Sequence, residues 1–172
     1  MLSRLRSRPL YPLIILLSFI FSSPLLASDS GTSKSDSNPW GSAKDIATEY
    51  KPQKVVYDVH VKTVEAVESV LDRASHLSTI TGADPFDQSI VLVLHGKELN
   101  FFAIKNYEKY KALMKRAQSL VESEVLTIRM CKIAAQSQGY APKDIHGFVE
   151  MVPMGDAEII RLQYEEGHAY MQ

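Results

Sequence analysis

The sequence has a single cysteine, Cys131, and lacks most of the motifs that identify common enzyme classes. It contains no CxxC pair, and its five histidines show neither HxxxH nor HExxH spacing, so residue spacing supports no metal site. The GxGxxG, P-loop and GxSxG motifs of dinucleotide-binding, NTP-binding and serine-hydrolase sites are also missing. We therefore predict no bound metal and no cofactor.

Clustered positive charge is absent as well. The chain has 19 Lys and Arg residues and 20 Asp and Glu residues, which gives a formal net charge of −1. Removing residues 1–27 would remove three arginines and no acidic residue, so the net charge would become −4. Binding to nucleic-acid phosphates requires clustered Lys and Arg, and we therefore expect no nucleic-acid partner.

Residues 1–27 have the layout of a secretory signal peptide. Three arginines precede an apolar stretch over residues 13–21, and the segment that ends at Ala27 resembles a cleavage region. We predict cleavage after Ala27 and a periplasmic protein without a stable membrane anchor. The alternative is an uncleaved anchor over residues 10–27, although its apolar stretch is shorter than the about 20 residues that a span needs.

Residues 28–51 are rich in Ser, Gly, Asp, Lys and Pro, and we predict that they form a flexible leader. Trp40 is the exception within it. This side chain either docks onto the domain or a neighbouring subunit, or stays exposed in the leader. Residues 54–172 follow and are numerous enough to form one domain with a hydrophobic core.

Strand and helix patterns alternate along this domain. Apolar and β-branched runs predict strands over 55–61, 90–94, 125–130, 148–152 and 169–171. Apolar residues at helical spacing predict helices over 64–80, 107–120 and 131–138 and after residue 156, with Thr63, Asn106 and Asp156 as N-caps. Such alternation forms right-handed βαβ units, so we predict a compact α/β sandwich with a mainly parallel sheet.

Two residues that can do chemistry stand at predicted strand ends. Cys131 lies on the turn between strand 125–130 and the next helix, where a helix N-terminus favours a thiolate. His95 ends strand 90–94, and ligands bind beyond the carboxyl ends of parallel strands. If the two strands are neighbours, the imidazole can deprotonate the thiol, so Cys131 and His95 are the candidate catalytic residues. The alternatives are core packing for Cys131 and a loop hydrogen bond for His95.

Several nearby residues give weaker signals. Lys132 and Arg129 bring positive charge close to Cys131, unless Arg129 points to the opposite face of the sheet. Phe101 and Phe102 are adjacent in a predicted loop, where both are not expected to face one core. One of them would then cover the cleft or lie in a subunit interface, and the favoured alternative for that residue is ordinary core packing. Binding of copper or haem through histidine and methionine is a third and weaker functional hypothesis.

Residues 54–172 resemble the DsrE/DsrF-like family, which includes sulfur-relay proteins. The resemblance rests on VVYDV at 55–59, on VLVLHG at 91–96, on CKIAA at 131–135 followed by a glycine, and on the closing stretch 152–170. It implies a small three-layer α/β sandwich with a mainly parallel five-stranded sheet, and assembly as a trimer or hexamer. In sulfur-relay members a cysteine at this position carries sulfur as a persulfide, so the resemblance implies that role for Cys131. His95 matches the HG pattern of the family.

Together these observations predict an exported DsrE-like protein of sulfur metabolism. It would carry or transfer sulfane sulfur on its single cysteine, with a donor or acceptor protein as a partner. The alternative is a non-enzymatic oligomeric module that binds a ligand or partner at the same cleft and uses the cysteine only for structure.

Overall fold

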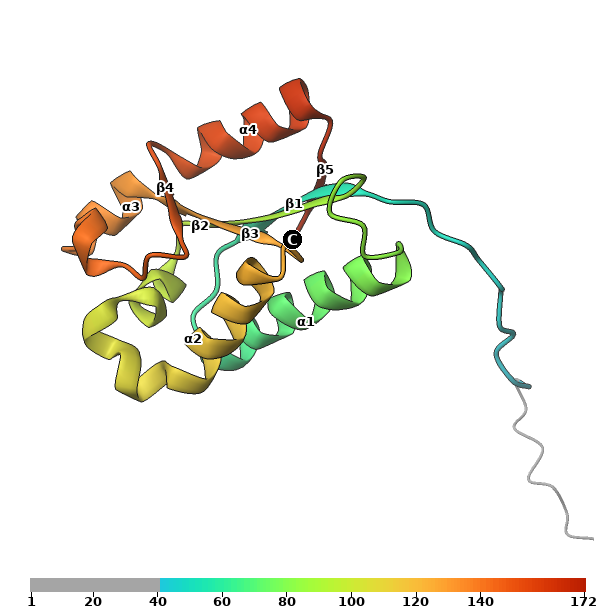
Figure 1. The fold of residues 1–172 in the computed structure, drawn as a ribbon, viewed down its shortest axis with the longest axis horizontal. Coiled ribbons are helices and arrows are strands. Elements are labelled where there is room, and N and C mark those ends of the chain that lie inside the picture. Colours follow the sequence, from blue (N-terminus) through green and yellow to red (C-terminus); the bar gives the residue numbers. More distant parts are fainter. Residues whose placement is uncertain (1–40) are drawn as a thin grey trace, which may run out of the picture. The chain divides into compact units, whose positions relative to one another are not determined.

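Five parallel strands form one sheet in the computed structural model, which describes residues 41–172 (Figure 1). Their spatial order is β4-β3-β2-β1-β5, and each neighbouring pair is parallel. This confirms the predicted α/β fold with a five-stranded sheet, which is parallel throughout. The strands are β1 (Lys54–Val59), β2 (Ser89–Leu94), β3 (Thr127–Cys131), β4 (Glu150–Val152) and β5 (Ala169–Met171).

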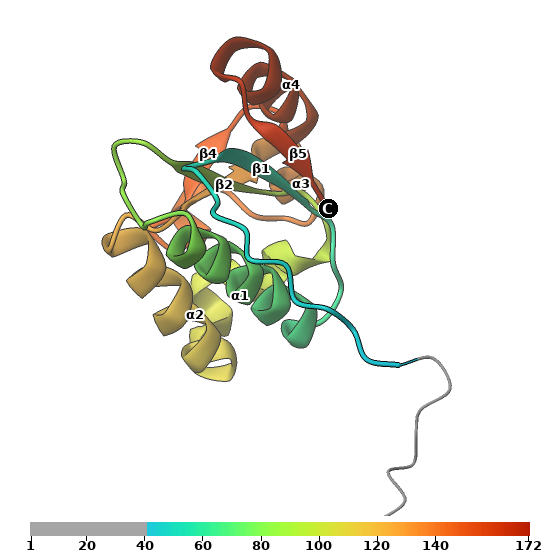
Figure 2. The same ribbon diagram turned by 90° about the vertical axis from the view of Figure 1, so that its right-hand side faces the viewer.

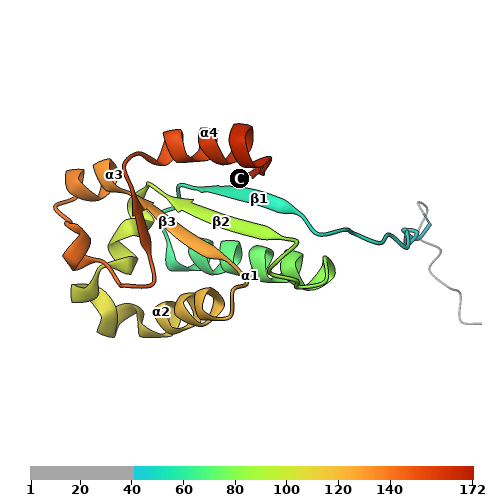
Figure 3. The same cartoon turned by 45° about the horizontal axis from the view of Figure 1, so that its top comes forward.

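Helices cover both faces of the sheet and complete the three layers (Figure 1, Figure 2). One face carries α1 (Val64–Ile80) and α2 (Tyr107–Glu122), and the other carries α4 (Gly155–Glu166). The short helix α3 (Lys132–Ser137) lies beyond the end of β3 (Figure 3). Three 3₁₀ helices lie in the connections, over Lys97–Phe102, Ile104–Asn106 and Pro142–Asp144.

The apolar sequence of β2 follows from this layering. Successive side chains of a strand point to opposite faces, and both faces of β2 are covered by helices. Leu92 and Leu94 pack in the larger core cluster on the side of α1 and α2. Val91 and Val93 pack in a smaller cluster with Ile159 of α4. A strand in this position therefore needs an apolar residue at every position.

The helix starts show one correct and two incorrect cap predictions. Thr63 caps α1, because its Oγ1 accepts a hydrogen bond from the backbone N–H of Ala66 over 3.2 Å. Asn106 stands at the N-cap position of α2, but its side chain donates to Asn100 instead. Asp156 lies in the first turn of α4, since the helix already begins at Gly155.

Phe101 and Phe102 both pack in the core, which confirms the favoured alternative and shows that the premise that two adjacent aromatics cannot both face one core is wrong. Both side chains are buried, because a 3₁₀ helix rather than an extended loop carries them, and that backbone turns both toward the core. Phe101 lies against Tyr110 in an edge-to-face contact, and Phe102 lies against Phe148 in the same way. Neither side chain is free to cover the cleft or to form a subunit interface.

The remaining regional predictions concern the first part of the chain. The predicted signal peptide (1–27), the alternative anchor (10–27) and Trp40 lie outside the described residues. The described part of the leader, residues 41–51, is exposed and has no regular secondary structure. Residues 46–172 form one compact unit. Within residues 41–172, no helix combines the length and the apolar character needed to cross a membrane.

Candidate functional site

The carboxyl ends of β1, β2 and β3 lie next to each other at one edge of the sheet. Val93 of β2 is paired with Arg129 of β3 in parallel register. His95 and Cys131 each follow this pair by two residues. Their side chains therefore project from the same face of the sheet as those of Val93 and Arg129. This is the face that α4 covers, because Val93 packs against it in the smaller core cluster. The topology brings both candidate residues to one place.

Cys131 is both the last residue of β3 and the N-cap of α3. Its Sγ accepts a hydrogen bond from the backbone N–H of Ala134 over 3.4 Å. Only 6% of the residue is exposed, but it borders a hollow of about 200 Å³ that we call the thiol hollow. The residue is thus largely covered and still borders open space. The other lining residues of the thiol hollow are His95, Ile133, Ala134, Met154 and Asp156.

Gly155, the first residue of α4, lies directly against this pair. A β-carbon at Gly155 would stand 3.2 Å from the β-carbon of Cys131 and 3.3 Å from that of His95. The β-carbons of Cys131 and His95 are therefore separated by no more than the sum of these two distances. Glycine has no side chain, and so it allows α4 to begin this close to both strand ends.

A chain of hydrogen bonds holds the imidazole of His95. Its Nε2 lies 2.5 Å from Oδ1 of Asp58, which projects from β1. The hydroxyl of Tyr170 in β5 donates to Oδ2 of the same carboxylate over 2.5 Å. Burial raises the pKa of the Asp58 carboxyl, but the bonds from His95 and Tyr170 outweigh burial and hold its pKa below the usual value. The hydrogen bond that Tyr170 donates to Asp58 raises the pKa of the Tyr170 phenol.

These hydrogen bonds determine which ring nitrogen of His95 is free to act as a base. Asp58 is ionised at neutral pH and can only accept hydrogen bonds, so the Nε2 of His95 must carry a proton. In the neutral ring the lone pair is then on Nδ1. A carboxylate that selects the tautomer of a histidine base is a recurring arrangement beside nucleophilic side chains.

A buried carboxylate, Glu98, fixes the backbone around His95. It is fully buried, and its two oxygens accept from the backbone N–H groups of Gly96 at 2.6 Å and Val61 at 3.0 Å. A β-carbon at Gly96 would lie only 2.5 Å from the Glu98 carboxylate and 3.1 Å from the α-carbon of His60. Gly96 is therefore required for the close approach of the loops that follow β1 and β2.

A second hollow of about 260 Å³ shares His95 and Ala134 with the thiol hollow. The rings of His60 and His95 meet edge to face there, with their centres 5.3 Å apart. We call it the basic hollow, because Lys97 and the two histidines are its ionisable lining groups. Its complete lining is His60, His95, Gly96, Lys97, Ala134, Ser137 and Gln138.

Arg129 does not add free positive charge to the thiol. Its guanidinium donates to Glu150 over 3.0 Å and to Glu158 over 2.5 Å. Hydrogen bonds from Arg161, which outweigh the opposing effect of burial, hold the pKa of Glu158 below its usual value, and Arg129 adds to this. Arg129 projects from the same face as Cys131, but its charge is matched by acidic partners. Lys132 is exposed.

Two other histidines, His146 and His168, have structural surroundings, whereas His76 is exposed on α1. The ring of His146 stacks on Phe148, and its buried Nε2 has no hydrogen-bond partner, so burial lowers its pKa. His168 is buried between the carbonyl of Leu162 and the hydroxyl of Ser89. Burial lowers its pKa, and the bond to Leu162 opposes the shift. Residues 41–172 contain no cluster of three His, Cys, Asp or Glu side chains that could hold a metal.

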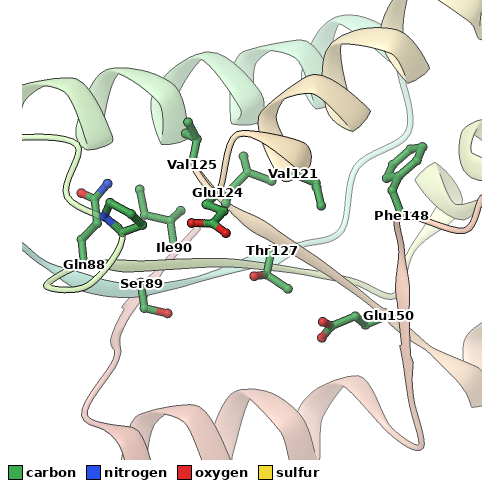
Figure 4. A pocket seen from close by; sticks show the side chains of 11 residues that line it. Gln88, Ser89, Ile90, Val121, Glu124, Val125, Thr127, Phe148 and Glu150 are labelled. Atoms are coloured by element: carbon green, nitrogen blue, oxygen red, sulfur yellow. The ribbon is translucent and has the colours of Figure 1, made fainter.

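Another pocket, of about 270 Å³, lies at the amino ends of β2 and β3 (Figure 4). Its ionisable lining groups are Glu124 and Glu150, and Figure 4 shows Thr127 between them. Glu150 is already paired with Arg129. Ser89 lines this pocket and its hydroxyl lies 2.9 Å from Nε2 of His168, but the partner of the other ring nitrogen is the backbone carbonyl of Leu162 and not a carboxylate. The pocket also lies at the end of the sheet opposite to the one where parallel sheets bind ligands. The candidate site is therefore assigned to the carboxyl ends of the strands.

Four residues of the site were not predicted from the sequence. Asp58 was assigned only to a strand, and its contact with His95 depends on the pairing of β1 with β2. Tyr170 reaches the site because β5 adds to the far side of β1. Glu98 and Gly155 act through contacts with residues distant in the sequence. Only the position of Asp58 within a strand that ends at the site could have suggested it.

Comparison with known proteins supports the fold. The structure is similar to that of MTH1491, a protein of unknown function from Methanobacterium thermoautotrophicum, with a TM-score of 0.55 and 19% sequence identity. The match covers 69% of this chain and 97% of that one. At this identity the likeness concerns the fold alone. No protein-family model and no curated protein sequence matches the chain.

Proposed function

We propose that the protein carries sulfane sulfur as a persulfide on Cys131 and belongs among the exported DsrE/DsrF-like proteins. The observation that carries this proposal is the shared thiol hollow, in which Cys131 lies beside a histidine whose tautomer is set by Asp58. The family resemblance of the sequence names the same sulfur atom.

In this mechanism His95 takes the proton of the Cys131 thiol on Nδ1, while Asp58 stabilises the imidazolium that forms. The backbone N–H of Ala134 donates to the resulting thiolate. The thiolate attacks the terminal sulfur of a sulfane donor, so that a new S–S bond forms and the donor's S–S bond breaks. The electron pair of the broken bond leaves with the rest of the donor. An acceptor thiolate later attacks the outer sulfur of Cys131, and the Cys131 thiolate is the leaving group.

Localisation and assembly extend the proposal. Residues 1–27 support export through a cleaved signal peptide, and the DsrE/DsrF-like resemblance supports a homotrimer or homohexamer. Export would place the thiol in an oxidising compartment, where disulfide formation and overoxidation compete with sulfur transfer. Purification for tests of sulfur chemistry should therefore be reducing and anaerobic.

A second candidate function is an oligomeric ligand- or partner-binding module with an inert cysteine. The observation that favours it is the 6% exposure of Cys131, since inert structural cysteines are buried. The two functions differ in how native Cys131 reacts. A carrier must admit a small thiol reagent through the thiol hollow, whereas an inert cysteine would react only as fast as the protein unfolds.

The decisive experiment is intact-mass measurement after anaerobic incubation with polysulfide. We expect increments of about 32 Da per sulfur atom and none in Cys131→Ser. Asp58→Asn should slow loading by at least about tenfold, because an amide no longer enforces the His95 tautomer. Asp87→Asn is the charge-matched control, because Asp87 is exposed and lines neither hollow. Absence of any increment on the folded wild-type protein would refute the carrier function.

A further inference from the structure

The basic hollow has a composition that selects for negative charge. None of its lining residues is a carboxylate, and Lys97 is exposed and forms no ion pair among residues 41–172. The rings of His60 and His95 and the hydroxyl of Ser137 add polar groups to it. The nearby carboxylate of Glu98 is fully buried and already accepts two backbone N–H bonds. A small anion would therefore meet donors in this hollow and no opposing ionised side chain on its lining.

The thiol hollow has the opposite character. Asp156 lines it, and Ile133 and Met154 supply exposed apolar surface. The two hollows meet at His95 and Ala134, the residue whose N–H donates to the sulfur of Cys131. A ligand that spans both would place an anionic head group beside Lys97 and its outer sulfur beside Cys131.

We propose that the basic hollow binds the negatively charged end of a small sulfane-sulfur donor and so presents the donor's sulfane sulfur to Cys131. This inference rests on the proposed carrier function and adds the class of donor to it. The charged end is a sulfonate or a carboxylate, as in thiosulfate or glutathione persulfide. Polysulfide has no separate anionic head group, and it serves as the comparison donor.

The reaction with thiosulfate balances without an added oxidant or reductant. The Cys131 thiolate attacks the outer sulfur of thiosulfate, and a new S–S bond forms. The original S–S bond breaks, and its electron pair leaves with sulfite. The products are the Cys131 persulfide anion and sulfite, so that total charge and atom count are unchanged. Sulfite would leave from the basic hollow.

The binding test uses full-length Cys131→Ser protein, which cannot react, and thiosulfate as the probe. Titration followed by NMR of the histidine rings should shift the signals of His60 and His95 in a saturable way. Lys97→Gln should weaken binding about two- to fivefold, the effect of losing one exposed ion pair. Lys132→Gln removes the same charge next to residue 131 but outside both hollows, and it should leave the affinity unchanged. Equal effects of the two lysine changes would overturn the proposal, since they would show general electrostatic attraction.

The loading test uses the otherwise wild-type chain with and without Lys97→Gln. Loading of Cys131 from thiosulfate or glutathione persulfide should slow about two- to fivefold, and loading from polysulfide should change less. The donor with the larger loss identifies the head group, sulfonate or carboxylate. If polysulfide loads Cys131 but neither anionic donor depends on Lys97, this inference fails and the carrier function stands. If no donor loads Cys131 while thiosulfate still binds through Lys97, the carrier function fails and the anion site stands.

Discussion

The contact of Gly155 with Cys131 and His95 gives a sharp test of how the site is built. In Gly155→Ala the added methyl carbon would lie 3.2 Å from the β-carbon of Cys131, 3.3 Å from that of His95 and 3.4 Å from Cγ1 of Val93. Carbon atoms pack best at about 3.5–4.0 Å. All three neighbours are held by the sheet, so α4 itself must move by a few tenths of an ångström.

The size of the effect follows from two opposing contributions. Overpacking of a well-packed interior costs about 1–3 kcal/mol. Replacing glycine by alanine stabilises the folded state by about 0.4–1 kcal/mol, because it reduces the conformational entropy of the unfolded chain. Taking the midpoints of the two ranges, we expect Gly155→Ala to lower the free energy of unfolding by about 1.3 kcal/mol, and by about 2.6 kcal/mol at most. The shifted helix should also uncover the sulfur, so a small neutral thiol reagent should modify native Cys131 faster.

Gly147→Ala is the matched control for this change. A β-carbon at Gly147 would have no heavy atom within 4 Å, so only the favourable entropy contribution remains. Urea denaturation of the two variants and the wild type gives both free energies, with m-values that test whether unfolding stays two-state. If Gly155→Ala proves as stable as Gly147→Ala, the close approach of α4 to the strand ends is wrong.

Three further predictions concern the surroundings of the site. Glu98→Gln should cost about 2–3 kcal/mol in urea denaturation, because an amide group then faces a buried N–H donor, whereas exposed Glu165→Gln should cost little. Burial lowers the pKa of His146 in the folded state, so the unfolded chain takes up a proton at this residue more readily than the folded protein. The free energy of unfolding is therefore at its full value above pH 6.5 and decreases as the pH falls from there through the folded pKa. His146→Phe should flatten the acid dependence of stability in that window, and an unchanged pH profile would contradict this. Asp58→Asn should shift the pH dependence of thiol modification while Asp87→Asn leaves it in place, since only the first change frees the His95 tautomer.

The fold could be predicted from the sequence because its main signals are local. The uniformly apolar run of β2 requires cover on both faces, and Thr63 marks the start of α1 through a contact only three residues away. The cap predictions for Asn106 and Asp156 failed for a physical reason. A side chain that can cap a helix can equally bond elsewhere, and a helix can begin one residue earlier, with Met154 at the N-cap position and no side-chain cap.

The site could be predicted only in part, because its partners meet across the sheet. Cys131 and His95 were recognised from strand ends alone. Their proximity required knowing that β2 and β3 are neighbours. The hydrogen bond between His95 and Asp58 depends on the pairing of β2 with β1. The hydrogen bond from Tyr170 to Asp58 depends on the pairing of β1 with β5, the last strand in the sequence. No periodicity within a single segment carries such information.

Stability alone does not account for this arrangement, and that bears on the choice between the two functions. Protein interiors are close-packed, so a cysteine kept only for packing would be expected to border filled space rather than the thiol hollow. A partly buried pair such as Asp58 and His95 pays for desolvation, and apolar residues of similar size would often stabilise the fold as well or better. A carrier gains from both features, since the hollow admits a donor and the pair prepares a base. In a carrier, the low exposure of Cys131 would also protect the persulfide between transfers.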